Sequence, residues 1–141
     1  MPPVQFFFPY KSISLRSRAE LKLFIAEILR KEGRKLSNLT YVFCDDDYLL
    51  NINRQHLKHD FYTDIITFDL SETNKLITGE IYISTDRVRD NALQLSTSLN
   101  EELHRVIFHG ALHLCGYRDK TREEERQMRQ KEDFYLKLYF K

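Results

Sequence analysis

Two histidines four residues apart, His109 and His113, are the side chains of this sequence best placed to do chemistry. Apolar residues recur at helical spacing around them, so both imidazoles project from one face of a predicted helix, where a single cation can bind both. Gly116 can adopt the left-handed conformation that ends a helix and reverses the chain, which returns Asp119 toward the same cation. We therefore predict one divalent metal ion per chain, Zn²⁺ from the chemistry of the ligands, held by His109, His113 and Asp119.

Three protein ligands leave a position on the metal for water, which is the catalytic rather than the structural arrangement. The string HGALHLCGYRD has the spacing of the metzincin signature of zinc proteases, but Gly110 stands where those enzymes carry a glutamate that acts as general base. This absence disfavours proteolysis. It favours attack on a phosphodiester, because the metal supplies hydroxide and the phosphate oxygens can share the proton transfer. The alternative without a metal is a pair of hydrogen-bonded helix histidines followed by an ordinary glycine cap.

Three sequence blocks carry a resemblance to a known family. The string HGALHLCGYRDK resembles the H-G-x-L-H-L-x-G-Y-D-H signature of the YbeY family, INRQHLKHDFYTDIITF resembles its L-N-x-x-[YF]-R-x-x-D-x-P-T-D-V-L-S-F segment, and GEIYIS resembles its G-D-I-x-I-S strand. The blocks lie in the family's order and extend from about residue 52 to about residue 120. The resemblance implies a metal-dependent endoribonuclease that acts on RNA in ribosomal RNA maturation, with the ribosome or ribosomal proteins as partners.

Two positions depart from the family pattern. When the two helix histidines are aligned, the family's third histidine falls on Asp119, and this carboxylate lowers the charge of the site by one unit. We therefore expect a less acidic metal-bound water and a wider tolerance of metals. When Thr63 and Asp64 are aligned, the family's arginine falls on Leu57, which cannot clamp a phosphate by paired hydrogen bonds.

Other residues are candidates for the same site. Arg105 lies one helical turn before His109 on the same face and could take the catalytic role of the missing arginine, or it could be a solvated or ion-paired side chain. The resemblance implies that Thr63 and Asp64 line the substrate cleft, although Thr and Asp also form ordinary turns before strands.

The composition fits one domain over residues 1–141, since 141 residues with 42% apolar side chains build one core and leave little room for a second. The formal net charge is +1, so any RNA-binding surface must be local. The stretch from Lys11 to Lys35 is locally cationic and either follows an RNA backbone or forms a solvated helix face. Two isolated cysteines and the absence of a long apolar run indicate a cytoplasmic protein that does not enter membranes.

The remaining histidines and cysteines have simpler predicted roles. His56, His59 and His104 have no spacing partner in the motif and are predicted to lie on the surface. Cys115 follows His113 by two residues, points away from the ligand face and is predicted to lie in the core.

Helices and strands are predicted without strict alternation, which indicates an α+β fold with a small mixed sheet, about five helices and the metal site at the end of a central helix. The predicted strands are 4–8 and 39–44, followed by a hairpin of 65–70 with 79–84. Helices are predicted to begin near Ser17, Asp45, Ser84, Ser98 and Thr121. An acidic residue three positions after Ser17, Ser98 and Thr121 indicates a capping box at each.

Together these features predict an endoribonuclease specific for single-stranded RNA that acts in ribosomal RNA maturation and ribosome quality control by metal-activated water. One alternative is a metalloprotease of metzincin-like spacing whose general base lies elsewhere. Another is a binding module for ribosome assembly whose metal is structural.

Overall fold

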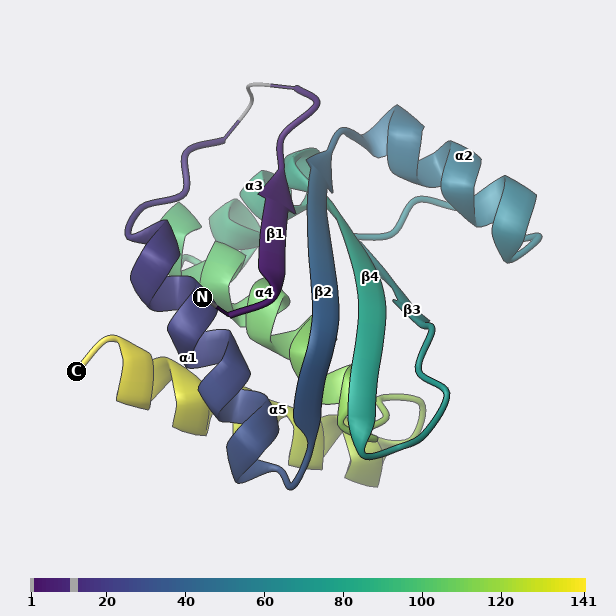
Figure 1. The fold of residues 1–141 in the computed structure, drawn as a ribbon. Coiled ribbons are helices and arrows are strands. Elements are labelled where there is room, and N and C mark those ends of the chain that lie inside the picture. Colours follow the sequence, from purple (N-terminus) through teal and green to yellow (C-terminus); the bar gives the residue numbers. More distant parts are fainter. Residues whose placement is uncertain (1, 11–12) are drawn as a thin grey trace.

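The computed structural model describes residues 2–10 and 13–141, and it contains a four-stranded mixed sheet in the order β1-β2-β4-β3 (Figure 1). Strands β1 (Val4–Phe7), β2 (Lys35–Cys44) and β4 (Leu76–Ser84) run parallel, and β3 (Ile65–Asp69) pairs antiparallel with β4. The helices are α1 (Arg18–Lys31), α2 (Asp46–His56), α3 (Thr85–Gln94), α4 (Leu99–Leu114) and α5 (Arg122–Tyr139). The predicted α+β fold, with its mixed sheet and its hairpin, is confirmed.

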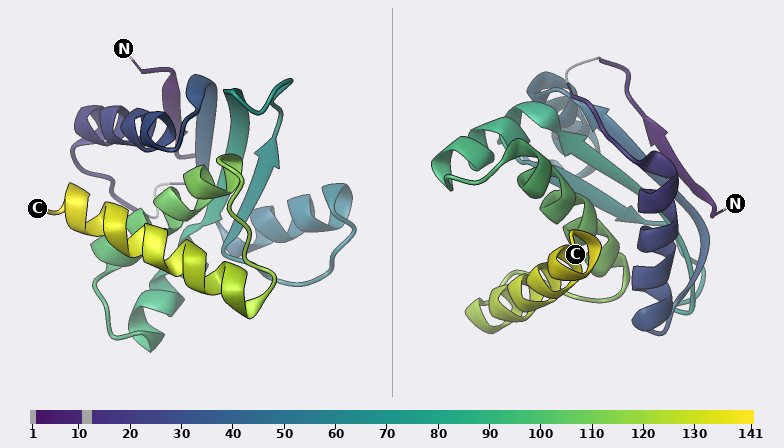
Figure 2. Two further views of the ribbon diagram at one scale, coloured as in Figure 1. Left: turned by 90° about the horizontal axis from the view of Figure 1, so that it is seen from below. Right: turned by 90° about the vertical axis from the view of Figure 1, so that its left-hand side faces the viewer.

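One face of the sheet forms the core. Along β2 and β4 burial alternates, so that Tyr41, Phe43 and Ile81 are fully buried while Val42 and Tyr82 are only partly buried. Helices α1 and α4 pack against the buried face, and α5 packs on α4, so that α4 lies between the sheet and α5 (Figures 1 and 2). The hydroxyl of Tyr41 donates a hydrogen bond of 2.9 Å to the carbonyl of Ile107, which ties β2 to the middle of α4.

Glycines allow α4 to approach the sheet closely. A Cβ atom at Gly110 would lie 2.8 Å from Cδ1 of Ile81, and a Cβ atom at Gly79 would lie 2.8 Å from Cδ1 of Leu114. Any larger side chain at either position would force Leu114 or Ile81 to shift within the packed core between α4 and β4. The face of α4 that carries Gly110 is therefore a packing surface, with no room for a catalytic carboxylate.

The helix starts follow the predicted capping residues with one exception. Asp45, Ser84, Ser98 and Thr121 each accept a hydrogen bond from a backbone N–H of the first turn, and Thr121 forms a full capping box. Of the capping boxes predicted at Ser17 and Ser98, the one at Ser98 is only half formed, because the Glu101 side chain accepts from Oγ1 of Thr97 instead, and the one at Ser17 is wrong. Ser17 has φ 53° and ψ 45° rather than the extended conformation of a capping residue, and its side chain makes no capping hydrogen bond.

Several strand boundaries also differ from the prediction: β3 ends at Asp69 rather than at residue 70, and β4 begins at Leu76 rather than at residue 79. Strand β2 begins at Lys35, earlier than the predicted residue 39, because it pairs with β4 from Leu76 onward through an irregularity between Leu36 and Asn38. Strand β1 ends at Phe7, one residue before the predicted end. No helix of the described residues is both long and apolar enough to cross a membrane.

The histidine predictions are partly confirmed. His56 and His59 are exposed, as predicted, and Cys115 is buried. The prediction for His104 is wrong, because its side chain is only 2% exposed and lies among the rings of Phe108, Tyr139 and Phe140. Its Nδ1 lies 2.7 Å from the carbonyl of Asn100, one turn earlier in α4, so that this imidazole is satisfied within the core.

Candidate metal centre and cleft

His109, His113 and Asp119 come together at the carboxyl end of α4. Gly116 adopts φ 100°, and the N–H of Tyr117 donates to the carbonyl of Leu112, so the chain reverses directly after the helix. This reversal places Oδ2 of Asp119 3.2 Å from Nε2 of His109 and 3.4 Å from Nε2 of His113. One ligand atom from each of the three residues lies within 4.8 Å of the others, as a single cation requires.

Both imidazoles are oriented by a second hydrogen bond. Nδ1 of His109 lies 2.6 Å from Oε2 of Glu132, and Nδ1 of His113 lies 2.9 Å from the carbonyl of Tyr117. Each partner is an acceptor, so each Nδ1 carries the proton and each Nε2 keeps a lone pair directed toward Asp119. This is the arrangement that metal-binding histidines adopt, and the residues present therefore fit a divalent metal.

Glu132 is a site residue that the sequence analysis missed. Glu132 lies on α5 and is 5% exposed. Its carboxylate contacts Nδ1 of His109 and also accepts a hydrogen bond of 2.9 Å from Nη1 of Arg105. No spacing rule connects position 132 with position 109, because the contact depends on how α5 crosses α4. The burial of this acid would have indicated a role, but burial is seen only in the folded structure and not in the sequence.

The environment shifts the pKa values of the two histidines in opposite directions. Burial alone would lower the pKa of His109, but the hydrogen bond and the charge of Glu132 outweigh burial and raise it. Burial and the neighbouring charge of His109 lower the pKa of His113. His109 therefore holds a proton more firmly than His113 does.

Arg105 lies in the site but is already engaged. Its Nη1 pairs with Glu132, and its Nη2 lies 2.7 Å from Oδ1 of Asp133. Arg105 is thus ion-paired, which was one of the two predicted alternatives, and its side chain also lines the cavity beside the histidines. The catalytic role predicted for Arg105 stays a prediction.

A cavity of about 880 Å³ lies in front of the metal-binding group. One wall consists of the segment between α2 and β3 together with β3, and the other consists of α4, the α4–α5 loop and α5. Thr63 and Asp64 line the first wall, and their role at a substrate cleft stays a prediction. None of the described residues in the cationic stretch up to Lys35 lines the cavity, and Lys11 lies outside the described residues.

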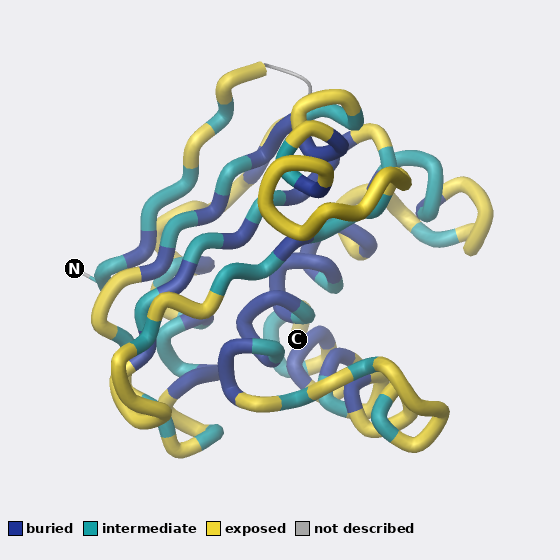
Figure 3. The backbone as a smooth tube through the Cα atoms, turned by 90° about the vertical axis from the view of Figure 1, so that its right-hand side faces the viewer, coloured by how far each residue is buried: buried dark blue, intermediate teal, exposed yellow. Residues whose placement is uncertain are grey.

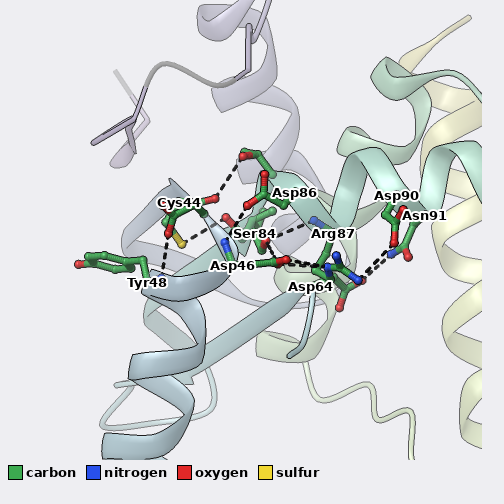
Figure 4. Close-up of polar contacts among 12 residues, drawn as sticks. Cys44, Asp46, Tyr48, Asp64, Ser84, Asp86, Arg87, Asp90 and Asn91 are labelled. Atoms are coloured by element: carbon green, nitrogen blue, oxygen red, sulfur yellow. Dashed lines mark hydrogen bonds and ion pairs between the residues drawn. The ribbon is translucent and has the colours of Figure 1, made fainter. Parts of the chain in front are cut away.

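Asp64 lies deep in this cavity. Its Oδ2 is 3.4 Å from Nδ2 of Asn91 on α3 (Figure 4), and its carbonyl accepts a hydrogen bond from the N–H of Ser84. Burial raises the pKa of the Asp64 carboxyl, and the charge of His109 partly opposes this effect. The Asp64 carboxyl thus lies close enough to His109 and Asp119 to interact with their charges.

A polar network holds α2 and α3 at the ends of β2 and β4 (Figure 4). The carboxylate of Asp46 accepts hydrogen bonds of 2.7 Å from Oγ of Ser84 and 3.1 Å from Nε of Arg87, and the N–H of Asp46 donates to Asp86. Because Asp46 opens α2 while Ser84 caps α3, this network fixes the direction in which α2 leaves the sheet. It thereby positions the wall of the cavity that follows α2.

Comparison with known proteins agrees with the site. The family model described as Endoribonuclease YbeY matches residues 10–139. The endoribonuclease YbeY of Cytophaga hutchinsonii is 52% identical over 124 residues, which cover 88% of this chain and 87% of that protein. The endoribonuclease YbeY of Porphyromonas gingivalis is 43% identical over 133 residues, which cover 94% of this chain and 87% of that protein.

A solved structure also matches. The solution structure of a protein from Thermotoga maritima superposes with a TM-score of 0.69 at 27% identity and covers 97% of this chain and 89% of that chain. Neither the metalloprotease alternative nor the binding-module alternative is favoured by these matches. The chain therefore belongs to the YbeY family of endoribonucleases that mature ribosomal RNA.

Proposed function

We propose that the cavity beside His109, His113 and Asp119 cleaves single-stranded precursor ribosomal RNA and that the ion held by these three residues is Zn²⁺. One observation carries the proposal. Both imidazoles are fixed through Nδ1 and present Nε2, together with Oδ2 of Asp119, to one point on the cavity wall. Two imidazoles and a carboxylate are a donor set that zinc accepts with a coordination position left open.

The charge of the cavity supports a bound cation. Among its lining residues, carboxylates outnumber basic side chains, the carboxylates being Asp64, Asp69, Glu102, Asp119 and Glu132 and the basic ones Arg105, Lys120 and Arg129. An RNA phosphate entering such a cavity would be repelled. A divalent cation at the histidines would offset this excess and make the cavity fit for a polyanion.

The residues around that ion have separate proposed roles. When bound, the metal would supply charge stabilisation and a water nucleophile at neutral pH. Glu132 holds the imidazole of His109 in the orientation that ligation needs, and Arg105 fixes Glu132 from the other side. Thr63 and Asp64 border the substrate from the opposite wall, and the N–H groups of Arg105 that remain free are the catalytic candidates for a phosphate oxygen.

The substrate and its setting follow from the same proposal. A precursor ribosomal RNA would reach the cavity as an unpaired segment, presented by the ribosome or a ribosomal protein in the cytoplasm. We propose this setting on the basis of the family, and the cavity beside the metal-binding group supports it.

The test compares two substrates and three proteins. The protein loaded with Zn²⁺ is incubated with ribosomal RNA and with casein, beside the variants Asp119→Ala and Asp119→His, and the metal content of each is measured by elemental analysis. We expect cleavage of RNA but not of casein, loss of metal in Asp119→Ala and retention in Asp119→His. RNA cleavage that survives metal removal, or equal metal content in all three proteins, would contradict the proposal.

A further inference from the structure

The wall of the cavity opposite the histidines carries an exposed aromatic ring. Phe61 is 55% exposed, lines the cavity and stacks on the imidazole of His59, with ring centroids 5.1 Å apart and an interplanar angle of 21°. Leu57 lines the cavity beside them. This end of the cavity thus offers an aromatic pair and a leucine, whereas the metal end is polar and charged.

The segment that carries Phe61 is held firmly although it is exposed. Asn53, which is 1% exposed on α2, donates from Nδ2 to the carbonyl of Phe61 at 2.9 Å. The carbonyl of Asn53 accepts hydrogen bonds of 3.1 Å from the N–H groups of both Leu57 and His59. One buried asparagine therefore fixes both ends of the segment, so the ring of Phe61 is presented before any ligand arrives.

From these contacts we propose that Phe61, backed by His59, is a stacking site for an unpaired nucleobase of the RNA that enters the cavity. Base stacking on aromatic rings is how proteins bind single-stranded nucleic acid without reading its sequence, since every base has a π face. A base that is paired in a duplex would have to be unpaired and unstacked before it could lie on this ring, so the site would favour single strands. This inference rests on the proposed function of the cavity.

The position of Leu57 agrees with a base at this site. Leucine offers no hydrogen bond to a phosphate, but its apolar side chain lies in the same cavity wall as Phe61 and can contact the edge of a stacked base or its ribose. Binding at this wall would therefore depend on the base rather than on the phosphate. Dependence of affinity on the base would distinguish the proposed stacking site from the metal end of the cavity, where binding would depend on the phosphate.

Tyr62 provides a matched control. It is the next residue in the chain and is 53% exposed, close to the value for Phe61, but it does not line the cavity. If exposure of an aromatic ring were sufficient for RNA binding, both residues would contribute equally. If the proposed site is correct, only Phe61 contributes.

The first measurement is affinity in the absence of cleavage. All proteins are loaded with Zn²⁺, and the ligand is a short unstructured RNA oligonucleotide with a non-hydrolysable backbone. We expect Phe61→Ala to bind this RNA about tenfold more weakly and Tyr62→Ala to bind it unchanged. An oligonucleotide with the same backbone but without bases should bind weakly to all variants and show no difference between them.

The second measurement uses the absence of tryptophan from the sequence. In Phe61→Trp the only indole of the protein would lie at the proposed site, and its fluorescence should be quenched by the RNA but not by the oligonucleotide without bases. Tyr62→Trp should show no quenching. Equal loss of affinity in the two alanine variants, or no quenching of Phe61→Trp, would overturn the stacking site.

The two proposals can fail separately. If metal-loaded protein cleaves RNA while Phe61→Ala and Phe61→Trp behave as the wild type, the stacking site is wrong and the proposed function stands. If Phe61→Trp is quenched by RNA but no metal supports cleavage, the stacking site stands and the proposed function is wrong.

Discussion

The two walls of the cavity are built in different ways. The helical wall, formed by α4 and α5, is part of the core: it packs on the sheet through Gly110, and its polar residues hold each other through His109, Glu132 and Arg105. The opposite wall follows α2 and is exposed from residue 54 to residue 62, as Figure 3 shows, with its backbone anchored on Asn53. Rigid packing suits a wall that must place ligand atoms accurately, and an exposed but anchored segment suits a wall that must meet a substrate.

Substitution of the glycine in the helical wall should have the largest effect. Gly110→Glu would drive a charged side chain into Ile81 and Ile65 of the sheet, which combines overpacking with burial of a charge. We expect a loss of several kcal/mol of unfolding free energy, or no folded protein, measured by denaturant unfolding. Leu57→Glu on the exposed wall is the control and should change stability by no more than about 0.5 kcal/mol. Similar stability of both variants would show that α4 does not need this close approach.

Glu132 tests whether the helical wall orients its ligands. Glu132→Gln weakens the acceptor for Nδ1 of His109 and should lower metal affinity by about 10- to 100-fold, measured by competition with a chelator. Asp133→Asn is the control, because Asp133 pairs with Arg105 but makes no contact with His109. If both variants lose affinity equally, the network acts through Arg105 rather than through the orientation of His109.

Asn53 tests the anchoring of the opposite wall. Asn53→Ala removes the donor to the carbonyl of Phe61 and should lower the unfolding free energy by about 1 to 2 kcal/mol. Hydrogen exchange of residues 57–61 should rise while metal affinity stays unchanged, because the hydrogen bonds of Asn53 hold residues 57–61 and do not involve His109, His113 or Asp119. Asn51→Ala, at an exposed position of the same helix, should change neither quantity. Increased exchange at α4 as well would mean that the two walls are not independent.

The same contrast explains which parts of the structure could be predicted from the sequence. His109, His113, Gly116 and Asp119 lie within eleven residues, so helix geometry and one glycine turn are sufficient to bring them together. The helix starts at Asp45, Ser84, Ser98 and Thr121 were predictable for the same reason, since capping is a contact within one turn.

Contacts between distant segments were not predictable. Glu132 reaches His109 only because α5 crosses α4, and His104 is buried only because Tyr139 and Phe140 at the end of α5 cover it. The stacked pair of His59 and Phe61 depends on an anchor six and eight residues back in the chain, in a stretch without helical or strand periodicity. Such contacts need the packed fold, and single-sequence patterns carry no signal for them.

The smallest predicted effect concerns the histidine behind the helical wall. Burial lowers the pKa of His104 below its ordinary value of 6.5, and the hydrogen bond to the carbonyl of Asn100 only partly opposes this. As the pH falls below 6.5, the unfolded chain takes up this proton before the folded protein does, so stability decreases. In metal-free protein, His104→Gln should reduce this acid slope, by at most about 1 kcal/mol per pH unit, in unfolding measured across the pH series. His56→Gln, on the exposed wall, should leave the slope as it is. An acid slope that is identical in the two variants would show that His104 is protonated in the folded protein as easily as in the unfolded chain.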